Sequence, residues 1–156
     1  MSGYSFPAVV VSLTMVSLGL FVLTRNAMSG VHRALFLQSL CLSLWLFSYG
    51  IMYSIQSAEV ARSLVNIGYM AVIFIPVTFY HFIFHFLKLY RKRAWLVLAY
   101  LVSGLFTLSL WFSTYFVSGM ERYLWGFYPK AGIIHPAFMA FFSTLYCSAV
   151  RFVFRA

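Results

Sequence analysis

The sequence lacks aspartate, and its only carboxylate side chains are those of Glu59 and Glu121. Sites built on a Ser-His-Asp triad, a pair of carboxylates or carboxylate-bound Mg²⁺ need more acidic residues than this chain has. The motifs GxxxxGK[ST], GxGxxG, HExxH and CxxC are absent as well. We therefore expect no enzymatic activity from this chain.

Charge of either sign is scarce in this chain. Charged residues make up 8% of the sequence, against about 25% in an average soluble domain. Hydrophobic residues account for 63% and aromatic residues for 21%. So few polar residues could not cover the surface of a soluble domain, and a disordered chain would be far less hydrophobic. The composition therefore predicts an integral membrane protein.

Five apolar runs are long enough, or nearly so, to cross a bilayer as helices, which takes about 20 residues. They cover residues 6–23, 34–53, 64–87, 94–112 and 133–152. The runs are continuous and do not alternate apolar with polar residues, as the strands of a membrane barrel do. The first run has no positive charge before it, so we expect a retained helix and not a cleaved signal peptide. The sequence thus predicts an all-α, polytopic helical bundle, a single membrane domain over residues 1–156.

The basic residues give this bundle an orientation. If five helices alternate in direction, one side receives eight basic residues: Arg25, Arg33, Lys88, Arg91, Lys92, Arg93, Arg151 and Arg155. The other side receives Arg62, Arg122 and Lys130 together with both glutamates. The positive-inside rule then places the N-terminus outside and the C-terminus in the cytoplasm of a bacterial inner membrane. Because the net charge is +9, we expect the protein to contact anionic lipid. Because the basic residues form no continuous face, we expect no nucleic-acid binding.

Residues 113–132 form the one long loop of the predicted bundle, and it faces outward. This segment combines turn-forming glycine and proline with six large aromatic residues. Aromatic residues are common at the membrane edge, but a folded loop over a ligand cleft would have the same composition. We expect residues 119–132 to be ordered and to fold back over the helix ends, with Trp125 and Tyr128 as anchors.

Polar and aromatic residues also occur inside the second predicted helix. Gln38, Trp45 and Tyr49 are spaced along one helical face. Such residues join neighbouring helices in a bilayer, and the alternative is that they line a ligand-binding cavity. The cysteines, Cys41 and Cys147, lie within apolar runs, where a free cysteine behaves as a small hydrophobic residue.

The third predicted helix contains a proline and two histidines. Pro76 removes a backbone donor and predicts a kink. His81 and His85 are four residues apart and share one helical face. A metal site needs three or four protein ligands, and His135 lies near the opposite membrane face, so we expect no metal, haem or other cofactor. The remaining interpretations are an interfacial pair bonded to tyrosine or lipid headgroups, or a pair sensitive to protonation.

Four short motifs follow one another along the chain. TRNAMSGVHR follows the first helix, SLWLFSYG contains Trp45, NIGYMAVIFIPVTFYHFIFHF contains Pro76, and WGFYPKAG precedes the fifth helix. In this order, over residues 20–150, they resemble the membrane-embedded N-terminal region of bacterial sensor histidine kinases of the seven-helix type. The resemblance implies a sensory module that passes a signal to cytoplasmic domains. The chain departs from the family in having five helices and no kinase or PAS domain, so we expect a truncated module or one completed by another chain.

The sequence therefore predicts a sensory, signal-input transmembrane domain whose partner is a signalling protein. The alternative is a structural accessory subunit of a larger membrane complex, respiratory or photosynthetic, that docks through its aromatic flanks. A transporter component ranks below both, because the predicted helices lack charges in their interior.

Overall fold

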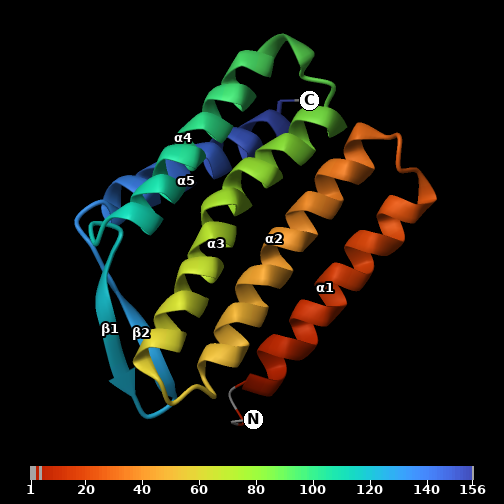
Figure 1. Cartoon of the computed structure of the whole chain (residues 1–156). Coiled ribbons are helices and arrows are strands. Elements are labelled where there is room, and N and C mark those ends of the chain that lie inside the picture. The colour runs from red at the N-terminus through yellow and green to blue at the C-terminus, as the bar shows by residue number, and fades with distance from the viewer. Residues whose placement is uncertain (1–2, 4, 156) are drawn as a thin grey trace.

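The computed structural model describes residue 3 and residues 5–155. Within these residues the chain forms five long helices, one short 3₁₀ turn and a two-stranded β-hairpin (Figure 1). The helices are α1 (Ser5–Arg25), α2 (Gly30–Met52), α3 (Ala58–Phe86), α4 (Arg93–Phe112) and α5 (His135–Val153), and the turn is η1 (Tyr90–Lys92). All five are long and apolar enough to cross a membrane, with η1 counted into the fourth span. The five predicted helices are thus confirmed.

The helix α3 is longer than its apolar stretch predicted. It begins at Ala58, whereas the sequence placed its start at residue 64. The Ser57 side chain accepts a hydrogen bond of 3.5 Å from the backbone N–H of Val60, and Glu59 lies in the first turn. Both features stabilise a helix N-terminus. The first turns of α3 are therefore polar, and hydrophobicity alone could not reveal them.

The prediction of an all-α fold was wrong for the segment after α4. Here β1 (Val117–Tyr123) and β2 (Gly126–Ala131) pair antiparallel, with Glu121 opposite Tyr128. Residues 127–130 are alternately buried and exposed, which is typical of a strand with one face packed against the protein. The expectation that residues 119–132 are ordered and fold back on the helices is therefore confirmed, but the sequence analysis did not predict that they do so as a pair of strands.

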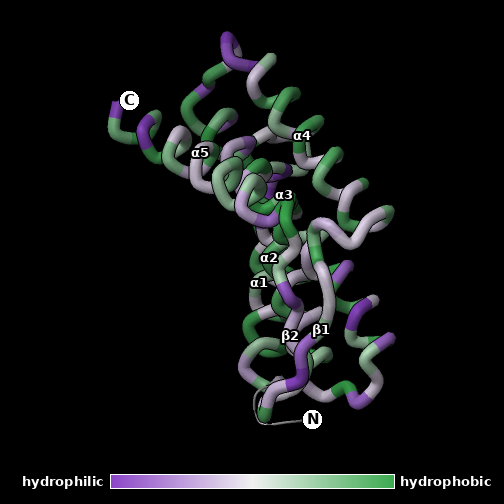
Figure 2. Tube along the Cα trace, turned by 90° about the vertical axis from the view of Figure 1, so that its left-hand side faces the viewer, coloured by the Kyte–Doolittle hydropathy of each residue, from purple (hydrophilic) through white to green (hydrophobic). Residues whose placement is uncertain are grey.

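The helices form a layered bundle around α3. On one side of α3 lies α2, and α1 packs on α2 in turn. On the other side, α4 and α5 both pack on α3. Along the α1–α2 seam, Ser12 donates a hydrogen bond of 2.9 Å to the carbonyl of Ser43, and a Cβ on Gly19 would lie 2.7 Å from the Ser39 Cβ. Small residues such as these allow helices to approach closely. Figure 2 shows hydrophobic residues along the helices and hydrophilic ones at the turns and on the hairpin.

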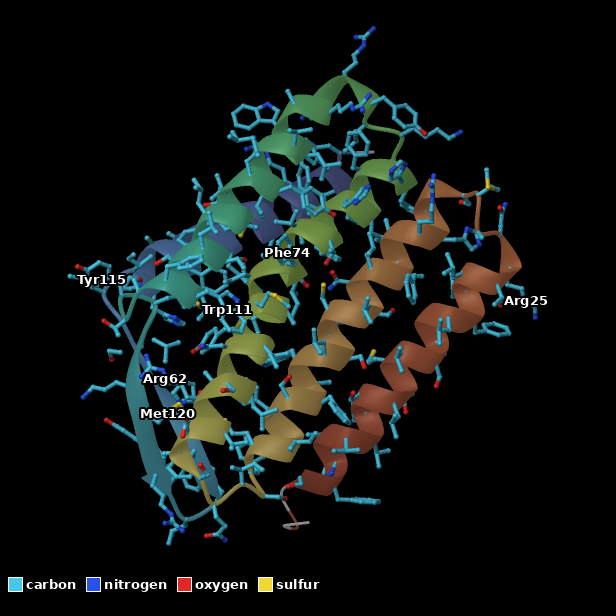
Figure 3. All side chains as sticks on the ribbon, in the orientation of Figure 1. Arg25, Arg62, Phe74, Trp111, Tyr115 and Met120 are labelled. Carbon is cyan, nitrogen blue, oxygen red and sulfur yellow. The ribbon has the colours of Figure 1, made fainter. Side chains whose placement is uncertain are left out.

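The bundle has two different ends. We call one the basic end, formed by residues 25–33, 87–93 and 151–155, and the other the hairpin end, formed by residues 53–59 and 113–134. Figure 3 shows Arg25 at the basic end and Arg62 and Met120 close to the hairpin end. A buried cluster containing Phe116, Phe127 and Phe138 stabilises the hairpin end, and a second cluster around Tyr80 and Phe84 stabilises the basic end. Because α3 contributes to both clusters, it connects the two ends.

Candidate functional site

The second half of α3 carries polar side chains that meet partners on α2 and α4. We call these residues the polar track, and its members are Gln38, Thr78, His81, His85, Tyr100 and Ser103. They lie within helices that are apolar enough to span a membrane. Polar side chains in such helices are costly and are frequently functional. The polar track is therefore the first candidate for a site.

The track begins near Pro76, in the middle of α3. The Thr78 hydroxyl, on a side chain 3% exposed, bonds to the Oε1 of Gln38 and lies 2.9 Å from the carbonyl oxygen of Phe74. From α4, the buried Ser103 hydroxyl donates a bond of 3.4 Å to the carbonyl of Ile73. Pro76 removes the N–H that would bond the carbonyl of Val72. The two hydroxyls bond the neighbouring carbonyls of Phe74 and Ile73, on the turn just before the proline. The helix continues through Pro76, and the kink there stays a prediction.

Towards the basic end, the track continues with the two histidines. The Nδ1 of His81 and the hydroxyl of Tyr100 share a hydrogen bond of 2.8 Å. The rings of His81 and His85 lie 5.0 Å apart between centroids, as their spacing predicted. The His85 ring packs on the start of α2, where a Cβ on Gly30 would lie 2.5 Å from its Nδ1. The predicted bond from a histidine of this pair to a tyrosine is therefore present.

The histidine pair is not joined by a third metal-binding side chain among the described residues. Among residue 3 and residues 5–155, no three His, Cys, Asp or Glu side chains gather as a metal site. His135 lies at the hairpin end, with its ring 5.8 Å from that of Tyr69. Two imidazoles and a phenol can exchange a proton or bind a polar ligand, and this is the chemistry that the track offers.

The three residues predicted on one face of α2 divide into two groups. Gln38 belongs to the polar track, whereas Trp45 and Tyr49 lie further towards the hairpin end. The rings of Trp45 and Tyr49 are 6.2 Å apart and edge-on, and Tyr49 meets Tyr53 in the same way at 6.5 Å. Tyr49 also packs against Gly68 of α3, where a Cβ would lie 3.1 Å from its ring. Trp45 and Tyr49 thus form part of the helix packing beneath the hairpin.

The predicted anchors of residues 119–132, Trp125 and Tyr128, are half-exposed in the hairpin. Trp125 stacks on Tyr123 at 5.0 Å, and Tyr128 meets Tyr123 edge-on at 6.3 Å. The residues that hold the hairpin to the helices are instead Phe116, fully buried, and Phe127, 8% exposed. Phe127 is placed by the strand register, and Phe116 directly precedes β1; the sequence analysis predicted neither position.

One acidic side chain lies among these hairpin residues. The hydroxyl of Tyr123 donates a hydrogen bond of 2.8 Å to Oε2 of Glu121, and Lys130 forms an ion pair with Oε1 at 3.5 Å. These contacts hold the pKa of Glu121 below its usual value of 4.5, and the hydrogen bond from Tyr123 is the largest single cause. The same bond raises the pKa of Tyr123. The three side chains join the two strands on the exposed face of the hairpin.

The sequence analysis missed Tyr100 and the surroundings of His135, and it did not predict which carbonyl Ser103 would meet. Tyr100 and Ser103 meet α3 only because α4 packs antiparallel to it with one particular rotation. His135 lies against Phe116 at 5.7 Å, and its buried Nδ1 has no hydrogen-bond partner within the part of the chain that the structure describes. No short motif marks these residues, since each interaction joins segments far apart in the sequence.

The chain matches no protein-family model, no curated protein and no solved structure. The resemblance to the membrane region of sensor histidine kinases therefore stays a prediction.

Proposed function

We propose that this chain is an integral membrane protein that crosses a bacterial inner membrane five times, with the basic end in the cytoplasm. Three features support the proposal. The five helices have the required length and hydropathy. Large hydrophobic side chains such as Leu18 on α1 and Leu101 on α4 are more than half exposed, which favours contact with lipid. Eight of the 11 basic residues belong to one end of the bundle.

Within this membrane protein we assign the role of a sensory, signal-input domain without catalytic activity of its own. One observation carries the assignment: α3 contacts the hairpin through its first half and the polar track through its second half. Because α3 joins the folded hairpin to polar groups near the cytoplasm, a displacement of the hairpin can pass along α3 to the basic end. The chain would then act on a separate signalling protein at the basic end.

The contacts that would carry a displacement can be followed along α3. Near the hairpin end, the Tyr69 ring lies 5.4 Å from the ring of Phe116, which is buried beneath the hairpin. Beyond Pro76, the same helix presents His81 to Tyr100 at 2.8 Å. A ligand or force that moves the hairpin would move Tyr69, and α3, which continues as a helix through Pro76, would transmit the shift to the histidines.

The alternative function is a structural accessory subunit of a respiratory or photosynthetic complex. It is favoured by exposed aromatic residues along α4, among them Trp95 (65% exposed), Trp111 (51%) and Phe112 (83%). Aromatic side chains of this kind are enriched at protein interfaces. They are also enriched at the membrane–water boundary, so this observation supports the subunit role less strongly than the α3 contacts support signalling.

Photo-crosslinking in native membranes distinguishes the two functions. A crosslinking residue at Arg91 samples the basic end, and one at Phe112 samples the exposed aromatic surface at the hairpin end. The signalling role predicts that position 91 captures a histidine kinase or a receiver protein, while position 112 captures lipid. Capture of electron-transfer subunits from both positions, with haem absorbance in the purified complex, would overturn the signalling role and establish the alternative.

A further inference from the structure

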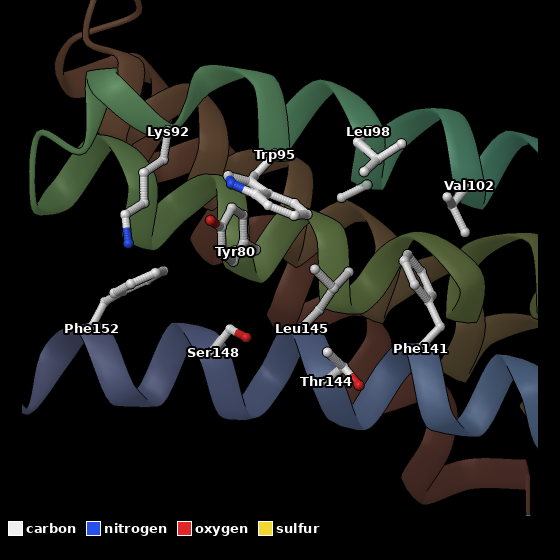
Figure 4. A pocket seen from close by; sticks show the side chains of 11 residues that line it. Tyr80, Lys92, Trp95, Leu98, Val102, Phe141, Thr144, Leu145, Ser148 and Phe152 are labelled. Atoms are coloured by element: carbon white, nitrogen blue, oxygen red, sulfur yellow. The ribbon is translucent and has the colours of Figure 1, made fainter.

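A groove runs between α4 and α5 on the side of the bundle away from α1 (Figure 4). It exists because both helices pack on α3 much more extensively than on each other. Its volume is about 450 Å³, and Tyr80 of α3 forms its floor. The walls are mostly apolar, with Trp95, Leu98 and Val102 on α4 facing Phe141 and Leu145 on α5.

The end of this groove near η1 is basic. There, the Nζ of Lys92 lies 3.7 Å from the centre of the Phe152 ring, so the ammonium group is held at the groove mouth by a cation–π contact. The exposed residues Arg91, Arg93 and Arg151 belong to the same end of the bundle. Neither acidic side chain of the sequence is nearby, because Glu59 and Glu121 both belong to the hairpin end.

The lining of the groove indicates what can occupy it. Among the described residues that line it, Lys92 is the one charged side chain, and it lies at the end near η1. The rest of the lining is mostly apolar. A hydrocarbon chain with a charged headgroup at one end has the same arrangement, and the apolar walls suit it.

We propose that this groove binds one acyl chain of an anionic phospholipid, with the lipid phosphate at Lys92. The apolar walls select a hydrocarbon chain, and the unopposed positive charge at the groove mouth selects an anionic headgroup over a zwitterionic one. The site lies on the face of α3 opposite α2, and it is independent of the signalling role proposed above. It makes the α4–α5 pair sensitive to the lipid composition of the membrane.

Tryptophan quenching in vesicles tests the proposal, because Trp95 lines the groove. The full chain with Trp45, Trp111 and Trp125 replaced by Phe is reconstituted in phosphatidylcholine containing equal amounts of brominated phosphatidylglycerol or brominated phosphatidylcholine. We expect brominated phosphatidylglycerol to associate at Trp95 about fivefold more strongly than brominated phosphatidylcholine. Lys92→Gln should reduce this ratio to near one. Arg91→Gln also removes one positive charge, but from a residue outside the groove, and should leave most of the preference for phosphatidylglycerol.

Two further proteins complete the design. A chain with Trp111 as its sole tryptophan reports the exposed surface of α4 outside the groove, and it should show no preference between the two lipids. Ser148→Phe, which fills the groove from α5, should lower the quenching of Trp95 by both lipids and remove the preference even if Lys92→Gln fails to fold.

Several outcomes would overturn the proposal. Equal quenching by the two lipids would mean that no anionic site exists. An equal loss in Arg91→Gln and Lys92→Gln would mean a general attraction of lipid to the basic end. Absence of quenching by either lipid would mean that protein covers the groove, and an unchanged preference in Ser148→Phe would place the lipid elsewhere.

Discussion

Gly132 lies where the hairpin returns to the helices, and its backbone is closely surrounded. Its N–H donates a hydrogen bond of 2.9 Å to the carbonyl of Phe116, and a Cβ at this position would lie 2.0 Å from the carbonyl oxygen of Tyr115. The obstacle is backbone and cannot rotate away as a side chain could. Only glycine fits this position, which fixes the base of the hairpin against α5.

We therefore predict that Gly132→Ala destabilises the protein by about 1–3 kcal/mol or more, the usual cost of forcing extra atoms into a packed region. The control is Gly119→Ala in β1, where a Cβ would meet nothing within 4 Å. Thermal unfolding in detergent compares the two variants. Equal stability of both would show that the hairpin base is not packed as described.

A second prediction at this scale concerns Glu121. Its pKa is lowered by the hydrogen bond from Tyr123 and by Lys130, so the folded hairpin favours the charged carboxylate. The stabilisation is present above the usual pKa of 4.5 and is lost as the pH falls through the lowered pKa. We expect the fluorescence of Trp125, which stacks on Tyr123, to change over that acidic range. Glu121→Gln should remove this change, and its persistence in the variant would contradict the role of Glu121.

The sequence revealed which residues of the helices are polar but not which partners they meet. Gln38, His81 and His85 stand out in apolar runs because any polar residue there is exceptional. Their partners Thr78 and Tyr100 depend on how far each helix is rotated about its axis. That rotation is set by the packing of many small apolar contacts, so spacing in one sequence could not predict it.

Among the elements, the hairpin differs most from the sequence prediction. The helices were predicted well because a long apolar run has few alternatives in a bilayer. The strands are short, and only alternate residues of β2 are buried, so their pattern resembles an ordinary aromatic-rich loop. Their stability comes from Phe127 and Phe116, which pack into the helix cluster at the hairpin end.

At this scale we predict that Phe127→Ala detaches the hairpin from the bundle. The side chain is 8% exposed, and removal of a buried phenylalanine costs about 3–5 kcal/mol. Leu124→Ala, in the fully exposed turn of the same hairpin, should change stability by less than about 0.5 kcal/mol. Limited proteolysis within residues 117–131 measures the difference. Equal resistance of both variants would show that Phe127 does not hold the hairpin.

For the whole molecule, the charge difference between the two ends predicts the orientation in the membrane. In a chain whose Cys41 and Cys147 are replaced by Ala, a cysteine at Leu124 should react with a membrane-impermeant maleimide in intact cells. A cysteine at Arg91 should react only after the inner membrane is opened. Labelling of position 91 in intact cells would reverse the topology and would exclude a cytoplasmic partner at the basic end.

Imidazole ¹⁵N NMR of the reconstituted chain tests whether α3 links the hairpin to the histidines of the polar track. The perturbation is Phe127→Leu, which alters packing under the hairpin without emptying it, and the control is Leu124→Ala. His81→Asn and His85→Asn assign the two signals. If α3 makes this link, Phe127→Leu shifts the signals of His81 and His85 as well as that of nearby His135, and Leu124→Ala shifts none of them. A shift confined to His135, with His81 and His85 unchanged, would contradict this link.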